Sequence, residues 1–507
     1  MLGYIYCAPR ILHQYRGKDL CAVHLDMGER YKTFDGGNEM ETTLALQKAA
    51  FIRDGVPSAK TRIERLDKSI DLLYTNSEAL CDAMSADFGH RSRDQSIFSD
   101  IGVSIDALKY AKKHLRRWMR PDRRSPEFPL GVLGARAVVH YQPKGVVGIV
   151  GPWNFPVNLA FAPLAGVLAA GNRAMIKPSE FTERTSRLMA QLISDYYPEE
   201  EVAVVTGGPD VGAAFTSLPF DHIVFTGATS IARHVMRAAA ENLVPVTLEL
   251  GGKSPVVIGE SADIDKAAVR IMSGKTLNAG QICLAPDYVF VPQKKTAQFI
   301  DAARSAVEKM YPGGLRDNED YTSVINRRHF DRLQSYLEDA ASKGAEIIEI
   351  NPGGEDFSQQ SHNKMAPHIV IGATEDMQLM QDEIFGPILP IKSYAETRET
   401  VTYINAHPRP LGLYYFGTDT AERDYVLNNT TSGGVTVNDV FFHVAQEDLP
   451  FGGVGPSGMG SYHGRDGFIE FSHKKAVYTQ ISADLFSIIR PPYGKKFRKF
   501  IAWRLKR

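Results

Sequence analysis

The middle of this chain alternates short, β-rich apolar runs with longer stretches of helical character, and this alternation constrains its fold more than any other feature. The apolar runs lie at residues 146–150, 174–176, 202–205 and 222–225. Strands separated by helical segments of this length run in the same direction within one sheet. The region therefore predicts a parallel β-sheet covered by helices, the architecture of an α/β domain.

A second alternating region follows Cys283. Its expected strands lie at 288–291, 369–371, 413–416 and 435–437, and its expected helices lie near 295–311, 328–343 and 396–406. A chain of 507 residues is long enough for about three domains. We predict two α/β lobes with Cys283 at their junction, because ligand sites concentrate between domains.

The segments outside the two lobes have simpler expected roles. Residues 1–40 lack clean periodicity and are interpreted as an N-terminal extension. Residues 41–120 carry apolar positions at helical spacing and are interpreted as scaffold rather than chemistry. Two strand-like runs, 137–141 and 476–479, lie far apart in sequence, and each is expected to be an edge strand open to pairing with another subunit.

Composition excludes several classes of partner and location. Lys and Arg total 58 against 59 Asp and Glu, so no overall charge favours nucleic acid. The four cysteines have no spacing typical of a metal site or a disulfide framework, which favours a reducing, cytoplasmic location. We expect no spanning helix, because no apolar run reaches about 18 residues, and no secretory signal.

Two motifs in the first lobe have the character of a dinucleotide site. The segment 225–230 closes a strand and opens a helix, so its backbone N–H groups can face a pyrophosphate. Lys177 and Glu180 follow the preceding strand, where their side chains can hydrogen-bond ribose hydroxyls. Each motif alone also fits a structural role, as a turn capped by Thr229 or Ser230 and as solvated surface charge.

Three further segments carry side chains suited to a binding cleft. Asn154 follows an expected strand, and its neutral amide can donate to a developing oxyanion, although alone it equally fits a Pro-flanked turn. Glu383 and Phe385 combine a carboxylate for sugar hydroxyls with an aromatic ring for a flat partner. The glycine-dense run 450–464 contains interleaved aromatic residues, which favours an ordered loop over a flexible linker.

Cys283 and Glu249 offer a nucleophile and a general base. A free cysteine is more often a small buried hydrophobic residue, and Glu249 equally fits a salt bridge with Lys253. Gly280 and Gln281, however, favour an exposed turn around the thiol rather than a core position.

Six ordered motifs resemble the motif series of the aldehyde dehydrogenase superfamily. They are Trp153-Asn-Phe-Pro, Lys177-Pro-Ser-Glu, Phe225-Thr-Gly, Glu249-Leu-Gly-Gly-Lys, Gly280-Gln-Ile-Cys and Glu383-Ile-Phe-Gly-Pro. The resemblance spans about residues 41–480. The residues after Cys283 and the run 450–475 are similar to the class 3 branch, and within it to bacterial coniferyl aldehyde dehydrogenases.

This resemblance implies the aldehyde dehydrogenase fold. It consists of a Rossmann-like cofactor domain, a second α/β catalytic domain and a small β oligomerisation element. The implied ranges are 41–128 and 146–248 for the cofactor domain, 249–440 for the catalytic domain, and 129–145 with 470–489 for the oligomerisation element.

The resemblance also implies a mechanism and a cofactor. Cys283 attacks an aldehyde carbon, Asn154 and the Cys283 backbone N–H hold the oxyanion, and Glu249 activates the water that hydrolyses the thioester. The implied cofactor is NAD, with NADP possible, and no metal is implied. The cofactor contacts that carry over by position are Trp153, Lys177, Glu180, Thr226, Gly227, Thr229, Ala232, Glu383 and Phe385.

One position departs from the family pattern. Where the family's turn usually reads G-x-T-x-x-G, the segment 227–232 of this chain ends in Ala232. We interpret the lost glycine as a helix–strand packing position, at which one methyl group is tolerated. Glu180 repels a 2′-phosphate and therefore favours NAD over NADP.

The last residues, 490–507, form a basic segment with apolar side chains on one helical face. Such a helix can make peripheral contact with an anionic membrane surface. The resemblance implies instead a homodimer in which the tail covers the partner subunit's substrate entrance, and we favour this interpretation.

The sequence therefore predicts an NAD(P)-dependent enzyme that oxidises an aldehyde to its acid. The substrate is expected to be aromatic, such as coniferaldehyde, or a medium- to long-chain aliphatic aldehyde. Glu249 argues against a CoA-acylating or acyl-phosphate relative, and Glu249 with Cys283 argues against a catalytically retired binding protein. A cofactor-free cysteine hydrolase is disfavoured because no histidine can be paired with Cys283 from sequence.

Overall fold

The computed structural model describes residues 37–358, 360–484 and 489–506. The expected N-terminal extension lies outside the described residues, except for its last four positions, which fall in helix α1. The scaffold region is helical as expected. Its elements are α1 (Gly37–Asp54), α2 (Ala59–Thr75), α3 (Ser77–Phe88), α4 (Arg93–Ser96), the π-helical turn η1 (Ile97–Gly102) and α5 (Val103–Trp118).

The first alternating region forms a six-stranded sheet in the order β15-β7-β6-β3-β4-β5. Its strands are β3 (Val146–Val150), β4 (Arg173–Lys177), β5 (Val202–Val204), β6 (His222–Thr226), β7 (Val246–Glu249) and β15 (Gly458–Met459). The strands from β5 to β7 are parallel, and β15 runs antiparallel to β7. Strands β3, β4 and β6 are almost wholly buried, as expected of parallel strands covered on both faces, so the predicted parallel sheet is confirmed.

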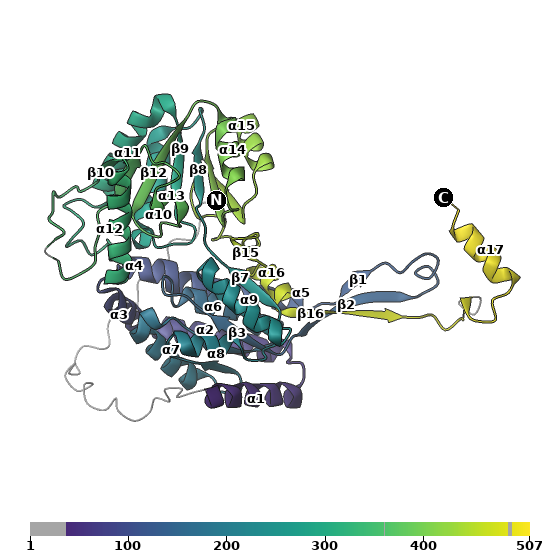
Figure 1. Ribbon diagram of the computed structural model, residues 1–507. Helices are drawn as coiled ribbons and strands as arrows, with labels where there is room; N and C mark the ends of the chain where they lie inside the picture. Colours follow the sequence, from purple (N-terminus) through teal and green to yellow (C-terminus); the bar gives the residue numbers. More distant parts are fainter. Residues whose placement is uncertain (1–36, 359, 485–488, 507) are drawn as a thin grey trace, which may run out of the picture. The chain divides into compact units, whose positions relative to one another are not determined.

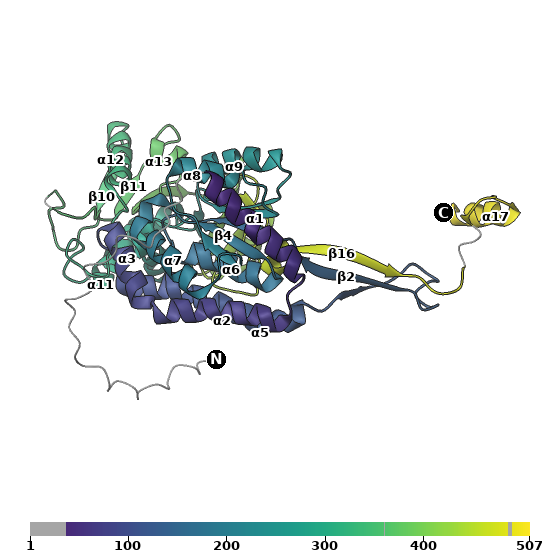
Figure 2. The same cartoon turned by 90° about the horizontal axis from the view of Figure 1, so that it is seen from below.

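Helices pack against this sheet and connect its strands (Figure 1). The connecting helices are α6 (Asn158–Ala170), α7 (Glu183–Tyr196), α8 (Pro209–Thr216) and α9 (Thr229–Glu241). Helices α2 and α5 lie side by side and both contact α6 (Figure 2). The helix α6 ends at Gly171, whose left-handed φ of 92° turns the chain toward β4.

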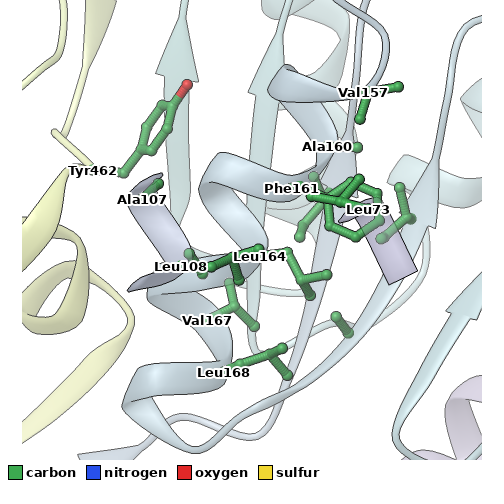
Figure 3. Packing of buried hydrophobic residues seen from close by; sticks show 14 of the residues in the cluster. Leu73, Ala107, Leu108, Val157, Ala160, Phe161, Leu164, Val167, Leu168 and Tyr462 are labelled. Carbon is green, nitrogen blue, oxygen red and sulfur yellow. The ribbon is translucent and has the colours of Figure 1, made fainter. Parts of the chain in front are cut away.

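The largest apolar cluster lies where α2, α5 and α6 meet (Figure 3). Leu73, Leu108, Phe161 and Leu168 are fully buried there, and each such side chain contributes about 1.5–3 kcal/mol to folding. Tyr462 joins the cluster from the glycine-dense run, and its hydroxyl points away from the labelled apolar side chains. The run is therefore an ordered part of the core, as the sequence predicts.

The second alternating region forms a seven-stranded sheet in the order β10-β11-β12-β9-β8-β13-β14. Its strands are β8 (Pro255–Ile258), β9 (Tyr288–Pro292), β10 (Glu346–Glu349), β11 (His368–Ile371), β12 (Ile388–Tyr394), β13 (Gly412–Phe416) and β14 (Gly434–Val437). All neighbouring pairs in this sheet are parallel except β10 with β11. Its helices include α10 (Ile264–Thr276), α11 (Thr296–Met310), α12 (Arg327–Ser342), α14 (Thr397–Ala406) and α15 (Thr420–Asn429).

A third sheet joins the two strand-like runs that lie far apart in sequence. Its antiparallel strands are β1 (Asp122–Arg124), β2 (Arg136–Pro143) and β16 (Ser472–Thr479), in the order β1-β2-β16. The expectation that both runs are edge strands is wrong for β2, because β2 is paired on both sides. Strand β16 keeps one open edge, and most of its side chains are exposed.

The basic tail contains helix α17 (Lys495–Arg504), which buries none of its residues. Its apolar side chains are exposed in part, with Trp503 70% exposed. Among the described residues, no helix combines the length and apolar character needed to cross a bilayer.

Candidate active site

The carboxyl ends of the parallel strands bring most of the predicted site residues to one edge of the first sheet. Val150 pairs with Lys177 across β3 and β4, and Thr226 pairs with Glu249 across β6 and β7. Because ligands of open α/β sheets bind at this edge, the position fits a cofactor and substrate site.

The predicted nucleophile, Cys283, follows a loop with unusual backbone geometry. Asn278, Ala279 and Gly280 have φ values of 49°, 52° and 72°, so three consecutive residues adopt the left-handed conformation. Such strain in non-glycine residues persists only where the surroundings enforce it, and it concentrates at functional sites. Gly280 and Gln281 are buried, so the expectation of an exposed turn is wrong, although Cys283 itself is only half-buried.

The side chain of Gln281 holds this loop in place. Its Nε2 donates to the backbone oxygens of Asn278 at 2.9 Å and Ser323 at 3.0 Å, and its Oε1 accepts from the Ile325 N–H at 2.9 Å. Gln281 is fully buried. Its hydrogen bonds stabilise the backbone that carries Cys283, because leaving these buried groups unpaired would be costly.

The side chain of Asn154 also contacts the loop that precedes Cys283. Its side chain is 3% exposed, and Nδ2 donates to the backbone oxygen of Gln281 at 3.0 Å. A carboxamide nitrogen carries two hydrogens, so this bond leaves the second N–H for another acceptor. The geometry thus places one amide N–H donor next to the segment that ends in Cys283.

Glu249 ends β7 in a buried position without a partner. Its side chain is 2% exposed, and among the described residues neither carboxylate oxygen has a hydrogen-bond partner. Burial, with a smaller effect of Glu470, raises the pKa of Glu249 well above its ordinary value. Lys253 pairs with Asp287, so the salt bridge considered for Glu249 does not form. A carboxyl group whose pKa is raised in this way is a stronger proton acceptor than an exposed one, which suits a general base.

The thiol of Cys283 shares this electrostatic environment. Burial raises its pKa above the ordinary value, and the carboxylates of Glu383 and Glu249 raise it further. At neutral pH the free protein therefore holds the thiol in its protonated form, and attack on an electrophile requires a proton acceptor.

Replacing Glu383 with glutamine is expected to accelerate alkylation of Cys283 by iodoacetamide at pH 9. The pKa of Glu383 is about 8, so its carboxylate is mostly charged at pH 9 and disfavours the thiolate. Removing this charge lowers the pKa of Cys283 and increases the thiolate fraction, which is expected to raise the rate several-fold. Glu260→Gln, at an exposed carboxyl, is the control. An unchanged rate in Glu383→Gln would contradict this electrostatic coupling.

In the turn between β6 and α9, polar groups lack hydrogen-bond partners among the described residues. A pyrophosphate site requires such free groups. Thr226 Oγ1 is buried and has no hydrogen-bond partner among the described residues. Helix α9 has Ala228 at its N-cap and no side-chain cap, so the alternative of a turn capped by Thr229 or Ser230 is not what the structure contains. Thr229 donates instead to the backbone oxygen of Pro456 at 3.2 Å.

Three other predicted cofactor contacts differ in their surroundings. Lys177 is 3% exposed, its Nζ donates to the Pro178 oxygen at 2.8 Å, and burial lowers its pKa. Glu180 is exposed at the start of a short 3-10 turn, with its side chain free to meet a ligand. Ala232 is 2% exposed and packs into the apolar cluster that contains Phe225, which fits the packing interpretation of this position.

Three aromatic side chains lie close together at the predicted cofactor site. The ring of Trp153 lies 5.3 Å from Phe385 in an edge-on arrangement and 5.1 Å from His329. Phe385 has a left-handed φ of 49°. Glu383 Oε1 is buried without a partner among the described residues, so a hydroxyl donor would satisfy it. His329 was not predicted, because it lies in the first turn of an ordinary amphipathic helix.

Tyr462 also belongs to the site and was given no role from sequence. It is 2% exposed, and burial, with smaller effects of Glu249 and Cys283, raises the pKa of its phenol. The only sequence signal is the presence of an aromatic residue inside the glycine-dense run.

Comparisons with known proteins define the class. The chain matches the aldehyde dehydrogenase family over residues 27–477. It is 58% identical to a probable coniferyl aldehyde dehydrogenase of Caulobacter vibrioides, over 92% of this chain and 97% of that protein. It is 50% identical to a coniferyl aldehyde dehydrogenase of Pseudomonas sp. HR199, over 91% of this chain and 95% of that protein. The substrate-bound structure of Staphylococcus aureus AldH is 35% identical, with a TM-score of 0.86, covering 92% and 99% of the two chains.

These matches identify an oxidoreductase. The chain belongs to the aldehyde dehydrogenase family, and it is an enzyme that oxidises aldehydes with a nicotinamide cofactor. Relatives in aldehyde dehydrogenase family 3 confirm the resemblance to the class 3 branch. The unpartnered Thr226 hydroxyl, the uncapped start of α9 and the unpartnered oxygen of Glu383 fit NAD, the cofactor of the family.

Proposed function

We propose that this enzyme oxidises an aromatic aldehyde of the coniferaldehyde type to its carboxylic acid, with Cys283 as nucleophile and Glu249 as general base. The observation that carries the assignment is the convergence of three side chains. Asn154 is hydrogen-bonded to the loop that precedes Cys283, and the unpartnered Glu249 carboxyl acts electrostatically on the Cys283 thiol. A nucleophile, an oxyanion donor and a base are the parts that covalent aldehyde oxidation needs.

The first half of the reaction forms a covalent intermediate. The thiol of Cys283 releases its proton to solvent, and the thiolate sulfur bonds to the aldehyde carbon while the carbonyl electron pair moves to oxygen. The resulting thiohemiacetal oxyanion is held by the free N–H of the Asn154 amide and by the Cys283 backbone N–H. NAD, when bound, would supply the acceptor for the hydride that leaves this carbon, and loss of the hydride would leave the C=O bond of a thioester on Cys283.

The second half releases the acid. The Glu249 carboxylate takes a proton from a water molecule, whose oxygen bonds to the thioester carbon. Cleavage of the carbon–sulfur bond then returns the sulfur to Cys283 and frees the carboxylic acid. The raised pKa of Glu249 makes its carboxylate a stronger base than an exposed one.

The cofactor contacts follow from the same proposal. Lys177 and Glu180 would hold the hydroxyls of the adenosine ribose, and Glu383 would hold those of the nicotinamide ribose. Trp153 and Phe385 would pack beside the nicotinamide end, and Thr226, Gly227 and Thr229 would line the pyrophosphate. Glu180 favours NAD over NADP, because its carboxylate would lie against a 2′-phosphate.

The aromatic substrate class is supported by aromatic side chains of the apolar cluster against which Cys283 packs. Phe451 and Tyr462 belong to the apolar cluster that Cys283 contacts, and Phe155 and Phe441 pack against the same cluster. Aromatic rings favour a flat aromatic ligand by offset or edge-on contact. The names of the relatives from Caulobacter and Pseudomonas point to the same class.

A panel of aldehydes tests the substrate and cofactor proposals together. Coniferaldehyde, benzaldehyde, hexanal and hexadecanal are each assayed with NAD and with NADP. We expect the highest kcat/KM for coniferaldehyde with NAD, and free acid as the product. A higher value for hexadecanal would contradict the aromatic assignment. Acyl-CoA as the product when CoA is added would overturn the hydrolytic role of Glu249.

We further propose a cytoplasmic homodimer joined through the open edge of β16. The exposed side chains and unpaired edge of this strand support pairing with a second copy, and the unpaired cysteines, Cys81 and Cys283 among the described residues, support a reducing location. The tail would cover the partner's substrate entrance. Deleting residues 490–507 is expected to change the KM for aldehyde. Unchanged KM with lost binding to anionic liposomes would favour peripheral membrane contact instead.

A further inference from the structure

Arg91 is a fully buried arginine in the region that the sequence presents only as scaffold. It is 2% exposed, and its Nη2 lies 2.6 Å from Oδ2 of Asp100, which is completely buried. The guanidinium group lies between the rings of Phe88 and Phe155, at 4.8 Å and 5.2 Å from their centroids. These contacts fix the plane of the guanidinium group as well as its position.

Asp100 connects this arginine to the loop after β3. It lies in the π-helical turn η1, and its Oδ1 accepts from the N–H groups of Val157 at 3.0 Å and Asn158 at 2.7 Å. These are the residues at the start of α6, immediately after the segment that contains Asn154. A π-helical turn inserted between two helices is a feature often found at functional sites.

Arg91 also contacts Asn154 directly. Its Nη1 donates to the backbone oxygen of Asn154 at 2.8 Å, and Asn278 Nδ2 donates to the same oxygen at 3.1 Å. The side-chain amide of Asn154 in turn donates to Gln281. The backbone of Asn154 is therefore held by Arg91, while its side chain is directed toward the Cys283 loop.

The same short segment contacts the Cys283 loop itself. Gln95 Oε1 accepts from the Asn278 N–H at 3.0 Å, and Gln95 Nε2 donates to the Asp320 oxygen at 2.7 Å. His90 accepts at its backbone oxygen from the Ser323 N–H at 3.0 Å. Residues 90–100 thus contact the Asn154 loop, the Cys283 loop and the segment 320–323.

Stabilisation of the fold is by itself a poor explanation for the buried Arg91–Asp100 ion pair. Removing two charges from water costs free energy that their attraction offsets only in part, and apolar residues often stabilise such a position as well or better. Directional hydrogen bonds, by contrast, fix the position of the Asn154 backbone more precisely than apolar packing does. An oxyanion donor works only if its N–H lies at the correct position before reaction.

We propose that Arg91, held by Asp100, is a positioning residue for aldehyde oxidation, because it fixes the Asn154 backbone so that the free amide N–H faces the oxyanion. The inference rests on the proposed role of Asn154. It assigns a role in the reaction to a residue that does not touch the substrate.

A double-mutant cycle tests the proposal. Arg91→Lys is expected to lower kcat by about 10- to 100-fold, a smaller loss than the roughly 10²- to 10³-fold of removing one oxyanion donor, with the KM for NAD within about twofold. In the Asn154→Ala background, the same substitution is expected to lower kcat by less than about threefold, because the amide that it positions is absent. Equal losses in both backgrounds would overturn the proposal.

Arg62 provides a matched control. It is equally buried, and it donates to the backbone oxygens of Pro57, Ala169 and Ala170, away from Asn154. Arg62→Lys is expected to lower the Tm without a kcat effect that depends on Asn154. A dependence on Asn154 as large as that of Arg91→Lys would show that any buried arginine gives this result and would overturn the proposal.

A second variant guards against a folding defect. Asp100→Asn keeps an acceptor for Val157 and Asn158 but removes the charge that holds Arg91, and it is expected to show the same dependence on Asn154. If both variants lose kcat equally with and without Asn154, the positioning role is wrong. If Asn154→Ala alone leaves kcat unchanged, the proposed oxyanion role fails instead, so the two failures are distinguishable.

Discussion

Replacing Cys283 with alanine is expected to lower aldehyde-dependent NADH formation by at least about 10³-fold, because no other group in the site can form the covalent intermediate. The fold is expected to survive, since Cys283 is only half-buried and loses a single sulfur atom. The measurement is steady-state NADH formation with a saturating aldehyde. Thermal unfolding and NAD affinity, measured alongside, are expected to stay close to the values of the unaltered enzyme.

Cys81 is the matched control for this substitution. It is a free cysteine that is 2% exposed, and burial raises the pKa of its thiol to about 11. Cys81→Ala is expected to keep kcat within about threefold, since small core truncations act mainly on stability. NADH formation that survives in Cys283→Ala but not in Cys81→Ala would show that Cys283 is not the nucleophile.

Replacing Glu249 with glutamine is expected to separate the two halves of the reaction. Hydride transfer precedes hydrolysis, so the first turnover is expected to give about one equivalent of NADH per site. Steady-state turnover is then expected to fall by about 10²- to 10⁴-fold, the usual contribution of a general base. Stopped-flow absorbance at the NADH band measures both phases.

Hydroxylamine provides a control for the Glu249 variant. As a stronger nucleophile than water, it attacks a thioester without help from a base, so it is expected to restore turnover in Glu249→Gln. Loss of the first-turnover NADH in this variant would instead mean that Glu249 is essential for deprotonating Cys283 before hydride transfer. No rescue by hydroxylamine would mean that thioester hydrolysis is not the step that Glu249 assists.

The β-rich runs of the sequence predicted many strands of the two large sheets, but β7, β8, β10 and β12 were not among them. Strands β3, β4, β6, β9 and β13 occupy the expected runs. Strand β12 was missed because it contains Pro390, which usually argues against an inner strand. The structure tolerates Pro390 because that part of β12 pairs with β11 alone, and pairing with β9 begins at Ile391.

The site was predictable to the extent that its residues lie in ordered motifs. Asn154, Glu249 and Cys283 stand in such motifs, and the structure brings their segments together. Arg91 and Asp100 could not be found in this way, because the sequence pattern of their region is typical of a polar amphipathic helix. Arg91 contacts Asn154 across 63 sequence positions and Asp100 contacts Val157 across 57, and only the folded chain brings these residues together.

The burial of the loop that precedes Cys283 could not be predicted from the sequence either. Gly280 and Gln281 are residues typical of an exposed turn, and the structure buries both. The reason is that the Gln281 side chain finds backbone partners at Asn278, Ser323 and Ile325. A polar residue is buried at little cost when all its hydrogen bonds are satisfied, and sequence alone does not reveal such partners.

In the proposed mechanism, Cys283 carries the acyl group and Glu249 directs its hydrolysis. Mass spectrometry of Glu249→Gln, quenched in acid after mixing with coniferaldehyde and NAD, tests it most directly. We expect one acyl group per chain, located by peptide mapping on Cys283 and removed by hydroxylamine. A protein that forms NADH but carries no adduct, or an adduct on any other residue, would contradict it.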